Sequence, residues 1–235
     1  MSCLLLRLAA PLQSWGDSSR FSRRRTRTEP TKSGVIGLLA AAQGRRRTDP
    51  IEDLAALRFG VRIDQPGRIE RDFQTSIRRR PGAKPEPMPL SYRYYLSDAV
   101  FVAGVEGHEK LLDGLDEALQ TPQFPLFLGR RACAPTEPLS LGVHPGSLED
   151  SLRAIEWQAA TWYRRQQYQV VHLELALDAP PGDVLAESVR DVPISYDPTR
   201  REYGWRDIMR PTERVVVPNP GGRSEPDFLA ALGGG

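Results

Sequence analysis

An arginine-rich segment with two aromatic residues runs from Pro11 to Ala42 and leads into an expected helix start. The first 47 residues carry ten basic and two acidic side chains, a local charge of +8, whereas the whole chain of 235 residues carries +2. Trp15 and Phe21 lie within this basic segment. Guanidinium groups pair with phosphates, aromatic rings stack on bases, and a helix N-terminus attracts anions. This combination indicates a segment that can hold a phosphodiester chain and stack its bases.

The expected helix start, Thr31 to Gly34, has two interpretations. Its amide groups and Lys32 can hold a phosphate, or Thr31 and Ser33 can cap the helix while Gly34 allows close packing. The pattern GxxxxGK[ST] is absent, so no P-loop and no nucleotide hydrolysis are implied. The residues alone leave both interpretations open.

Four other features also have a structural alternative. The run Arg23 to Arg25 can contact a nucleic-acid backbone or form a solvated loop. The run Arg45 to Arg47 follows a helix C-terminus, where the helix dipole favours cations. Trp15 can stack on a base or serve as a buried anchor. For Trp157 and Trp162 a place in the core is the better interpretation.

Composition limits the possible classes of protein. With 40% hydrophobic and 26% charged residues, the chain is expected to be a globular protein with a proper core. No apolar run approaches 18 residues, and the N-terminal MSCLLLRLAAPL is interrupted by Arg7 and too short for a signal sequence. We therefore expect a cytoplasmic protein. Cys3 and Cys133 show no CxxC spacing, which predicts reduced thiols, no metal and no cofactor.

The apolar patterns predict an α+β fold with the order βαβ, hairpin insertion, βαβ. Strands are expected at residues 3–9, 57–63, 91–104 and 125–131, and helices from 31–33 onward and at 108–120. Between residues 68 and 89, the run Arg78 to Arg80 and the four prolines at 81, 85, 87 and 89 predict a protruding hairpin. This order is ferredoxin-like, or RRM-like, βαββαβ. We expect this domain to span residues 1–140, with its hairpin thumb at about 68–97.

A smaller C-terminal β-rich unit is expected over residues 141–235. Its patterns predict a helix around residues 148–163, a strand at 170–177, and a further strand or hairpin between 192 and 217.

Seven blocks occur in order between Leu4 and Arg206: LLLRLAAPLQSWGDSSRF, PTKSGVIGLLAAAQGRRR, LRFGVRID, DFQTS, YYLSDAVFVAGVEG, PLFLGRRAC and DVPISYDPTRREYGWR. Together they resemble the CasD family, whose members are the subunits of the type I-E CRISPR Cascade complex that hold the 5′ end of the guide RNA (crRNA). The resemblance implies an RRM-like core of the repeat-associated RNA-binding superfamily. It also implies a thumb hairpin and a non-catalytic role as a cap.

The resemblance carries RNA-binding roles onto two groups of residues. The first group, which would meet the repeat-derived 5′ handle, is Gln13, Ser14, Trp15, Arg20, Phe21, Arg23, Arg24, Arg25, Arg27, Thr31, Lys32, Ser33 and Gly34. The second group would form the thumb together with DFQTS, and comprises Arg78, Arg79, Arg80, Tyr92 and Arg93. The implied partners are crRNA, the Cascade backbone subunits and the large subunit, with target DNA reached through the assembled complex and no membrane contact.

The favoured hypothesis is a non-catalytic crRNA-binding subunit that caps the 5′ handle in antiviral defence. The alternative is a metal-independent endoribonuclease that processes CRISPR repeat RNA, for which the nearest acid–base grouping is His108 with Lys110. An exposed helix start explains these two residues equally well. No Ser/His/Asp order, HExxH or paired-carboxylate motif indicates another enzyme. A general single-strand binder without handle preference is a third possibility.

Overall fold

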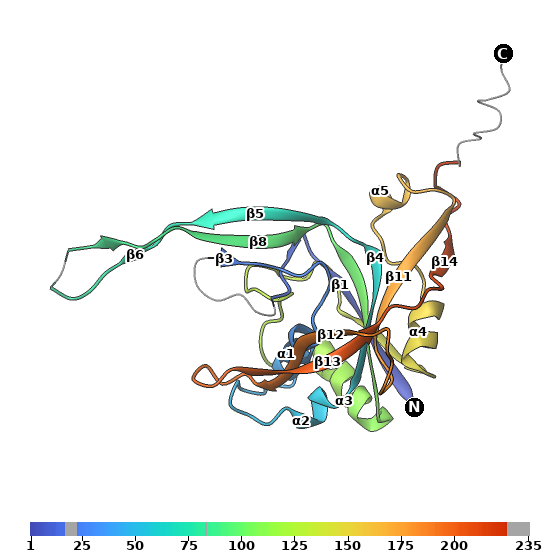
Figure 1. Ribbon diagram of the computed structural model, residues 1–235, viewed down its shortest axis with the longest axis horizontal. Coiled ribbons are helices and arrows are strands. Elements are labelled where there is room, and N and C mark those ends of the chain that lie inside the picture. Colours follow the sequence, from blue (N-terminus) through green and yellow to red (C-terminus); the bar gives the residue numbers. More distant parts are fainter. Residues whose placement is uncertain (17–22, 83, 225–235) are drawn as a thin grey trace, which may run out of the picture.

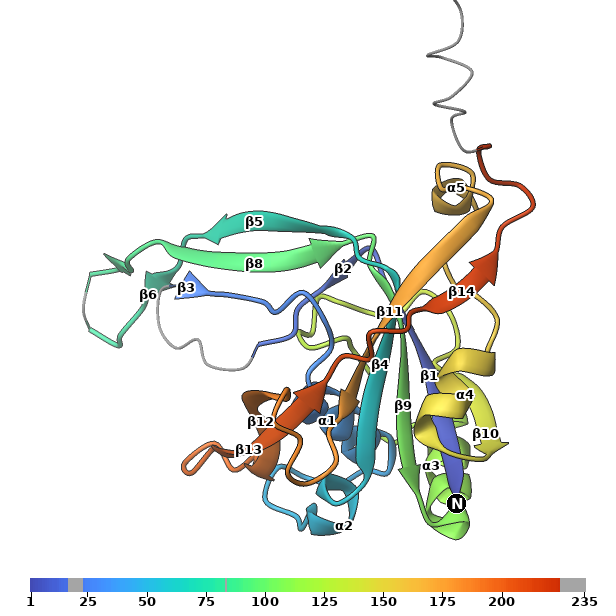
Figure 2. The ribbon, with the colours of Figure 1, turned by 45° about the vertical axis from the view of Figure 1, so that its right-hand side comes forward.

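The computed structural model describes residues 1–16, 23–82 and 84–224, which form a sheet-rich α/β fold (Figures 1 and 2). The strands are β1 (Ser2–Ala9), β2 (Leu12–Gln13), β3 (Arg23–Arg24), β4 (Arg58–Gln65), β5 (Arg68–Gln74), β6 (Ile77–Arg78), β7 (Glu86–Pro87), β8 (Ser91–Ser97), β9 (Val100–Gly107), β10 (Ser140–Pro145), β11 (Val170–Asp178), β12 (Glu187–Ser195), β13 (Glu202–Met209) and β14 (Val215–Pro218). The helices are α1 (Lys32–Ala42), α2 (Glu52–Ala55), α3 (Glu109–Gln120), α4 (Leu148–Ala154) and α5 (Thr161–Arg164). None of these helices has the length and apolarity needed to cross a membrane.

The main sheet has the strand order β10-β1-β9-β4-β11-β13-β12, with β14 also paired to β11. Every neighbouring pair in this order is antiparallel. Strand β1 shows why its sequence is apolar on both faces. Leu4, Leu6 and Leu8 belong to the core cluster under α1 and α3, whereas Cys3 and Leu5 belong to a second cluster under α4. Helices on both faces therefore bury the alternating side chains of this strand.

Helix α1 begins and ends where its sequence predicts. The Thr31 side chain accepts a hydrogen bond from the Gly34 amide at 3.2 Å, and Val35, Ile36 and Leu39 are buried against the sheet. Gly44, just past the helix, has a φ of 79°, a conformation that favours glycine. The predicted helix start and end are both confirmed.

The hairpin expected after residue 68 is formed by β5 and β8, which pair from Arg68 opposite Ser97 to Gln74 opposite Ser91. It projects from the main sheet and carries the β6–β7 pair at its far end (Figure 1). The single strand predicted at residues 91–104 is wrong, because Asp98 has a φ of 53° and separates β8 from β9. Aspartate tolerates this left-handed conformation better than most residues. The single run therefore forms two strands: β8 belongs to the hairpin, and β9 belongs to the main sheet.

Two further predictions fail because of contacts between distant segments. Residues 125–131 form no strand: the Leu128 amide donates to the Cys133 carbonyl at 2.7 Å, and the Leu128 carbonyl accepts from the Ser14 amide at 3.1 Å. The next strand of the main sheet along the chain is β10, which pairs with β1 on the side away from β9. The helix expected at 148–163 is two helices, α4 and α5, with extended backbone between them.

The strands that follow residue 140 extend the sheet built by the earlier ones. Strand β10 pairs with β1, and β11 pairs with β4. The expected boundary at residue 140 stays a prediction, although strands from both sides of it share one sheet.

Candidate nucleic-acid interface

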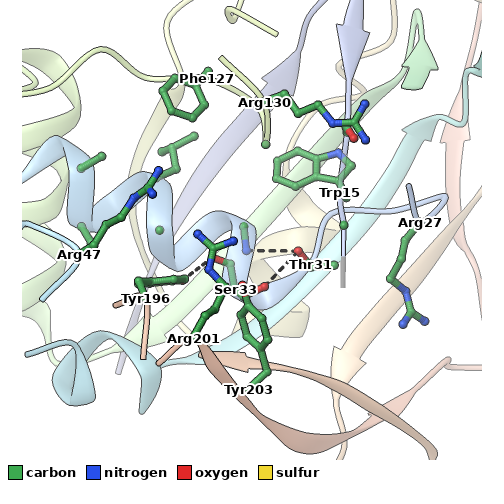
Figure 3. Close-up of a pocket in the computed structure, with 18 of the residues that line it drawn as sticks. Trp15, Arg27, Thr31, Ser33, Arg47, Phe127, Arg130, Tyr196, Arg201 and Tyr203 are labelled. Atoms are coloured by element: carbon green, nitrogen blue, oxygen red, sulfur yellow. Dashed lines mark hydrogen bonds between the residues drawn. The ribbon is translucent and has the colours of Figure 1, made fainter. Parts of the chain in front are cut away.

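A groove of about 1440 Å³ lies over α1. One wall is the segment from Phe124 to Arg131, and the other is formed by β12, β13 and the turn between them. Figure 3 shows Phe127 and Arg130 on one side of α1, and Tyr196, Arg201 and Tyr203 on the other. The groove therefore joins an early helix to two segments from much later in the chain.

The groove is strongly basic. Among the described residues, ten arginines and one acidic residue, Glu187, line it. The arginines are Arg24, Arg25, Arg27, Arg45, Arg46, Arg47, Arg130, Arg131, Arg190 and Arg201. A cleft lined by charges of one sign concentrates ions of the opposite sign. A polyanion therefore matches this groove.

Besides the buried Trp15, five aromatic side chains of the described residues lie among the arginines, namely Phe124, Phe127, Tyr196, Tyr203 and Trp205. The Tyr196 hydroxyl donates a hydrogen bond to the Ser33 carbonyl, and burial raises the pKa of this hydroxyl. Tyr196 is therefore a neutral anchor between the β12–β13 turn and α1. Basic groups interleaved with aromatic rings are typical of proteins that bind single-stranded nucleic acids.

The surface of α1 that faces the groove carries small residues. Ser33, Gly37, Ala40 and Ala41 line it. A Cβ atom at Gly37 would stand 3.3 Å from the Tyr196 hydroxyl oxygen. Gly37 therefore lets the Tyr196 ring pack directly against the helix, and Leu38 is the one larger apolar side chain of α1 in the described lining.

The phosphate interpretation of the helix start is wrong for Lys32. The side chain of Lys32 is 7% exposed, and its Nζ lies 3.1 Å from Asp178 Oδ2. The Lys32 amide donates to Asp191 Oδ2 at 2.8 Å, and Thr31 caps the Gly34 amide. Protein carboxylate and hydroxyl oxygens therefore already occupy the positions in which a phosphate would be held.

Gln13 and Trp15 are also structural. Gln13 is fully buried, and its Nε2 donates to the carbonyls of Leu8 at 3.0 Å and Ala99 at 2.7 Å. Trp15 is 1% exposed, and its Nε1 donates to Gln13 Oε1 at 3.0 Å. The indole has no free face on which a base could stack, so the stacking prediction for Trp15 is wrong and the buried-anchor interpretation is correct.

Replacing Gly34 by Ala is expected to destabilise the protein by about 1–3 kcal/mol, because the added Cβ would stand 2.7 Å from Trp15 Cε3. Gly114 in α3 is the matched control, since a Cβ there meets no heavy atom within 4 Å. Gly114→Ala should stabilise the protein by about 0.5–1 kcal/mol, the usual gain in an exposed helix. Denaturant unfolding measures both changes. A stabilising Gly34→Ala would contradict the tight Trp15 contact.

The remaining residues of the first predicted group have different positions. Arg24, Arg25 and Arg27 line the groove, as do the largely buried Ser14 and Ser33. Arg23 belongs to β3, while Arg20 and Phe21 lie outside the described residues. Strand β3 runs parallel to β8, with Arg23 opposite Tyr92 and Arg24 opposite Arg93. The backbone thus brings the arginine segment beside the hairpin.

The second predicted group, on the hairpin, does not line the groove. Arg78, Arg79 and Arg80 are exposed near the far end of the hairpin, and Arg78 lies 4.0 Å from Glu86 across it. On β8, Tyr92 has the Arg71 guanidinium 5.4 Å from its ring centroid. Those predicted residues that are exposed therefore lie on two surfaces, the groove and the hairpin.

The sequence predictions missed most of both groove walls. Arg130, Arg131, Arg190 and Arg201 were not predicted, and neither were the aromatic residues of the walls. Arg130 is held in place, since it lies 4.6 Å from the Tyr95 ring centroid and donates to the Arg24 carbonyl at 2.9 Å. Two arginine pairs close to aromatic residues could have indicated the walls: GRR at residues 129–131 and TRRE at residues 199–202.

The groups considered for catalysis and redox chemistry lie elsewhere. His108 precedes α3, and neither it nor Lys110 lines the groove. Cys3 and Cys133 are buried free thiols. Burial, with Glu106 as a second cause, raises the pKa of the Cys3 thiol to about 12. Both cysteines are therefore core residues.

These features define a class of protein: a sheet-rich α/β scaffold with a projecting hairpin and an arginine-lined groove suited to single-stranded nucleic acid. The family model described as CRISPR-associated protein (Cas_Cas5) matches residues 3–209, and the chain belongs to that family.

One protein of known name and two solved structures are similar to this chain. The chain is 36% identical over 159 residues to the CRISPR system Cascade subunit CasD of Escherichia coli (strain K12), which covers 60% of this chain and 70% of that protein. A chain of a CRISPR RNA-guided surveillance complex matches with a TM-score of 0.73 and 33% identity, covering 98% of this chain and 97% of the other. A crystal structure of a Cas protein matches with a TM-score of 0.65 and 36% identity, covering 95% and 99%. The resemblance to CasD is confirmed.

Proposed function

We propose that this chain is a non-catalytic subunit of a Cascade-type CRISPR surveillance complex that binds the repeat-derived 5′ handle of crRNA. The observation that carries this proposal is the groove, which ten arginines, several aromatic residues and one acidic residue line in the described part of the chain. Its relatives named as a Cascade subunit and as part of an RNA-guided surveillance complex support the same role. The protein is proposed to act in the cytoplasm.

The RNA is proposed to enter as a single strand. Arginines on both walls would pair with phosphates, while the aromatic rings accept bases that are splayed out of the strand. The small side chains on α1 leave room for the backbone of the RNA to approach the helix. This binding mode replaces the phosphate site first expected at Lys32.

The scaffold for this site is proposed to be ferredoxin-like. The elements β1, α1, β4, β9, α3 and β10 follow one another in the order βαββαβ once the hairpin, the short strands β2 and β3 and the single-turn helix α2 are set aside. Their strands lie side by side in the order β10-β1-β9-β4, all antiparallel, which supports that topology.

The hairpin is proposed to contact the neighbouring Cascade backbone subunit and the first guide nucleotides. Its exposed arginines, Arg78 to Arg80, favour contact with RNA. The large subunit is a further proposed partner, and target DNA would be reached only through the assembled complex.

The endoribonuclease alternative is less well supported. No histidine lines the groove in the described part of the chain, and His108 and Lys110 lie outside the lining. An RNA-cleaving site needs an acid and a base placed beside the ribose 2′-hydroxyl. The basic groove accounts for binding without such groups.

The proposal is tested by measuring binding of the full chain to RNA carrying the host's 5′ handle and to RNA with a scrambled handle, across a salt series. We expect tighter, salt-sensitive binding of the handle RNA, with the RNA intact on a gel. Equal binding of both RNAs would indicate a general single-strand binder. Cleavage that disappears when His108 and Lys110 are both replaced by Ala would overturn the non-catalytic role.

A further inference from the structure

The hairpin of β12 and β13 has two chemically different faces. One face carries Asp191 and Arg206, which are paired with each other at 2.6 Å. The other carries Arg190, Tyr203 and Trp205, which line the groove. In the strand register, Arg190 lies opposite Trp205. Successive residues along a strand point to opposite sides. One face of this two-stranded ribbon, β12 with β13, therefore packs on the protein interior, while the other face lines the groove.

The inward face fixes the position of this ribbon. Arg206 contacts Asp191 through two nitrogens, at 2.6 and 2.9 Å, and Asp178 through a third at 2.6 Å. Its guanidinium also lies 5.1 Å from the centroid of the Phe59 ring. Bidentate pairs of this kind hold a fixed geometry. The groove face of the ribbon is therefore supported by a rigid, largely buried network.

The outward face presents an unusually exposed indole. Trp205 is 68% exposed, although tryptophan is among the side chains that gain most from burial. In the described part of the chain, no other aromatic ring and no guanidinium stacks on it. Beside it, the Arg190 Nε donates to the Tyr203 carbonyl at 2.9 Å, which holds that guanidinium on the ribbon.

We propose that Trp205 is a stacking platform for one unpaired base of the bound RNA, with Arg190 beside it for the adjoining phosphate. This assignment deepens the proposed function and rests on it. The ring lies inside an arginine-lined groove, where a nucleic acid is the matching occupant. Every base has a π-face, so the platform adds affinity at one position of the strand without choosing the base.

The test is a thermodynamic cycle between the protein and the RNA. The full-length protein and its Trp205→Ala variant are each titrated with handle RNA and with a series of RNAs in which one base at a time is removed. Stacking contributes about 1–3 kcal/mol per base, so we expect Trp205→Ala to weaken binding of intact RNA about 5- to 150-fold. At one position, removing the base should weaken wild-type binding and leave the variant unaffected.

Two further variants complete the design. Trp205→Phe retains a ring and should recover part of the lost affinity. Trp162→Ala removes another exposed indole, 50% exposed on α5 and outside the groove lining, and should bind RNA like the wild type.

The outcomes separate the two proposals. If the wild type binds handle RNA but Trp205→Ala binds equally well, or if no base position is coupled to Trp205, the platform is overturned and the proposed function stands. Unchanged RNA binding with weakened assembly onto a protein partner would reassign Trp205 to a protein interface and also overturn the platform. If the wild type does not prefer the handle, the proposed function itself fails.

Discussion

Replacing Asp64 by Ala is expected to lower the free energy of unfolding by about 3–5 kcal/mol, because it leaves a buried guanidinium without its counter-ion. Arg62 and Asp64 are both fully buried, and they form a bidentate pair with Nε–Oδ1 and Nη2–Oδ2 distances of 2.7 and 2.9 Å. The midpoint of denaturant unfolding, followed by circular dichroism, measures the loss.

The size of this effect follows from what the pair holds together. Arg62 also donates to the carbonyls of Leu152, Ile155 and Glu156 at 2.7, 2.6 and 2.8 Å, and the Gln158 amide donates to Asp64 Oδ2 at 2.6 Å. The pair thereby fixes the extended segment that separates α4 from α5. Removing Asp64 breaks the ion pair and this attachment together.

A surface pair supplies the control for this prediction. Glu174 and Arg214 lie 2.7 Å apart with about half of each side chain exposed. Glu174→Ala should cost less than about 1 kcal/mol, as is usual for exposed ion pairs. Similar losses of unfolding free energy in the two variants would contradict the prediction, because they would show that the buried Arg62–Asp64 pair stabilises the protein no more than an exposed pair.

The sequence predicted those elements whose signals are local. Helix α1 has its cap at Thr31, its apolar period and its terminal Gly44 within fourteen consecutive residues, so its bounds followed from the chain itself. The segment 125–131 looks like a strand by composition, but Gly129 has a φ of 90°, and a Cβ there would stand 1.7 Å from the Ser14 carbonyl oxygen. A contact between residues so distant along the chain leaves no local pattern.

The same limit explains the errors in the site. The residue type of Lys32 indicates a phosphate ligand, but its partners Asp178 and Asp191 follow 146 and 159 residues later. Charge clustering in the first 47 residues correctly indicated a basic surface, because Arg24, Arg25 and Arg27 do line the groove. The sequence could not predict which later strands complete it, since that depends on the order of strands in the sheet.

Replacing four groove arginines, Arg24, Arg47, Arg131 and Arg201, by Gln is expected to lower RNA affinity and flatten its dependence on salt. These four exposed side chains come from β3, from the loop that follows α1, and from the two walls. Each phosphate contact to a single strand contributes about 0.7 to the slope of log K against log salt. If all four make contacts, the slope falls by about 3, so between 50 and 200 mM salt the wild type should lose about 50-fold more affinity than the variant.

A control variant with the same change in net charge separates direct contacts to RNA phosphates from the general electrostatic attraction between protein and RNA. Four other arginines lie outside the groove lining: Arg153, Arg165, Arg214 and Arg223. Their replacement by Gln removes four positive charges, the same number as in the groove variant. Because exposed charges farther apart than about 8–10 Å are screened at physiological salt, this control should keep a slope close to that of the wild type. Equal slopes in the two variants would mean that the arginines of the groove bind RNA no more directly than those elsewhere. A reduced slope in the groove variant alone, with unfolding unchanged, would place the RNA backbone between the two walls.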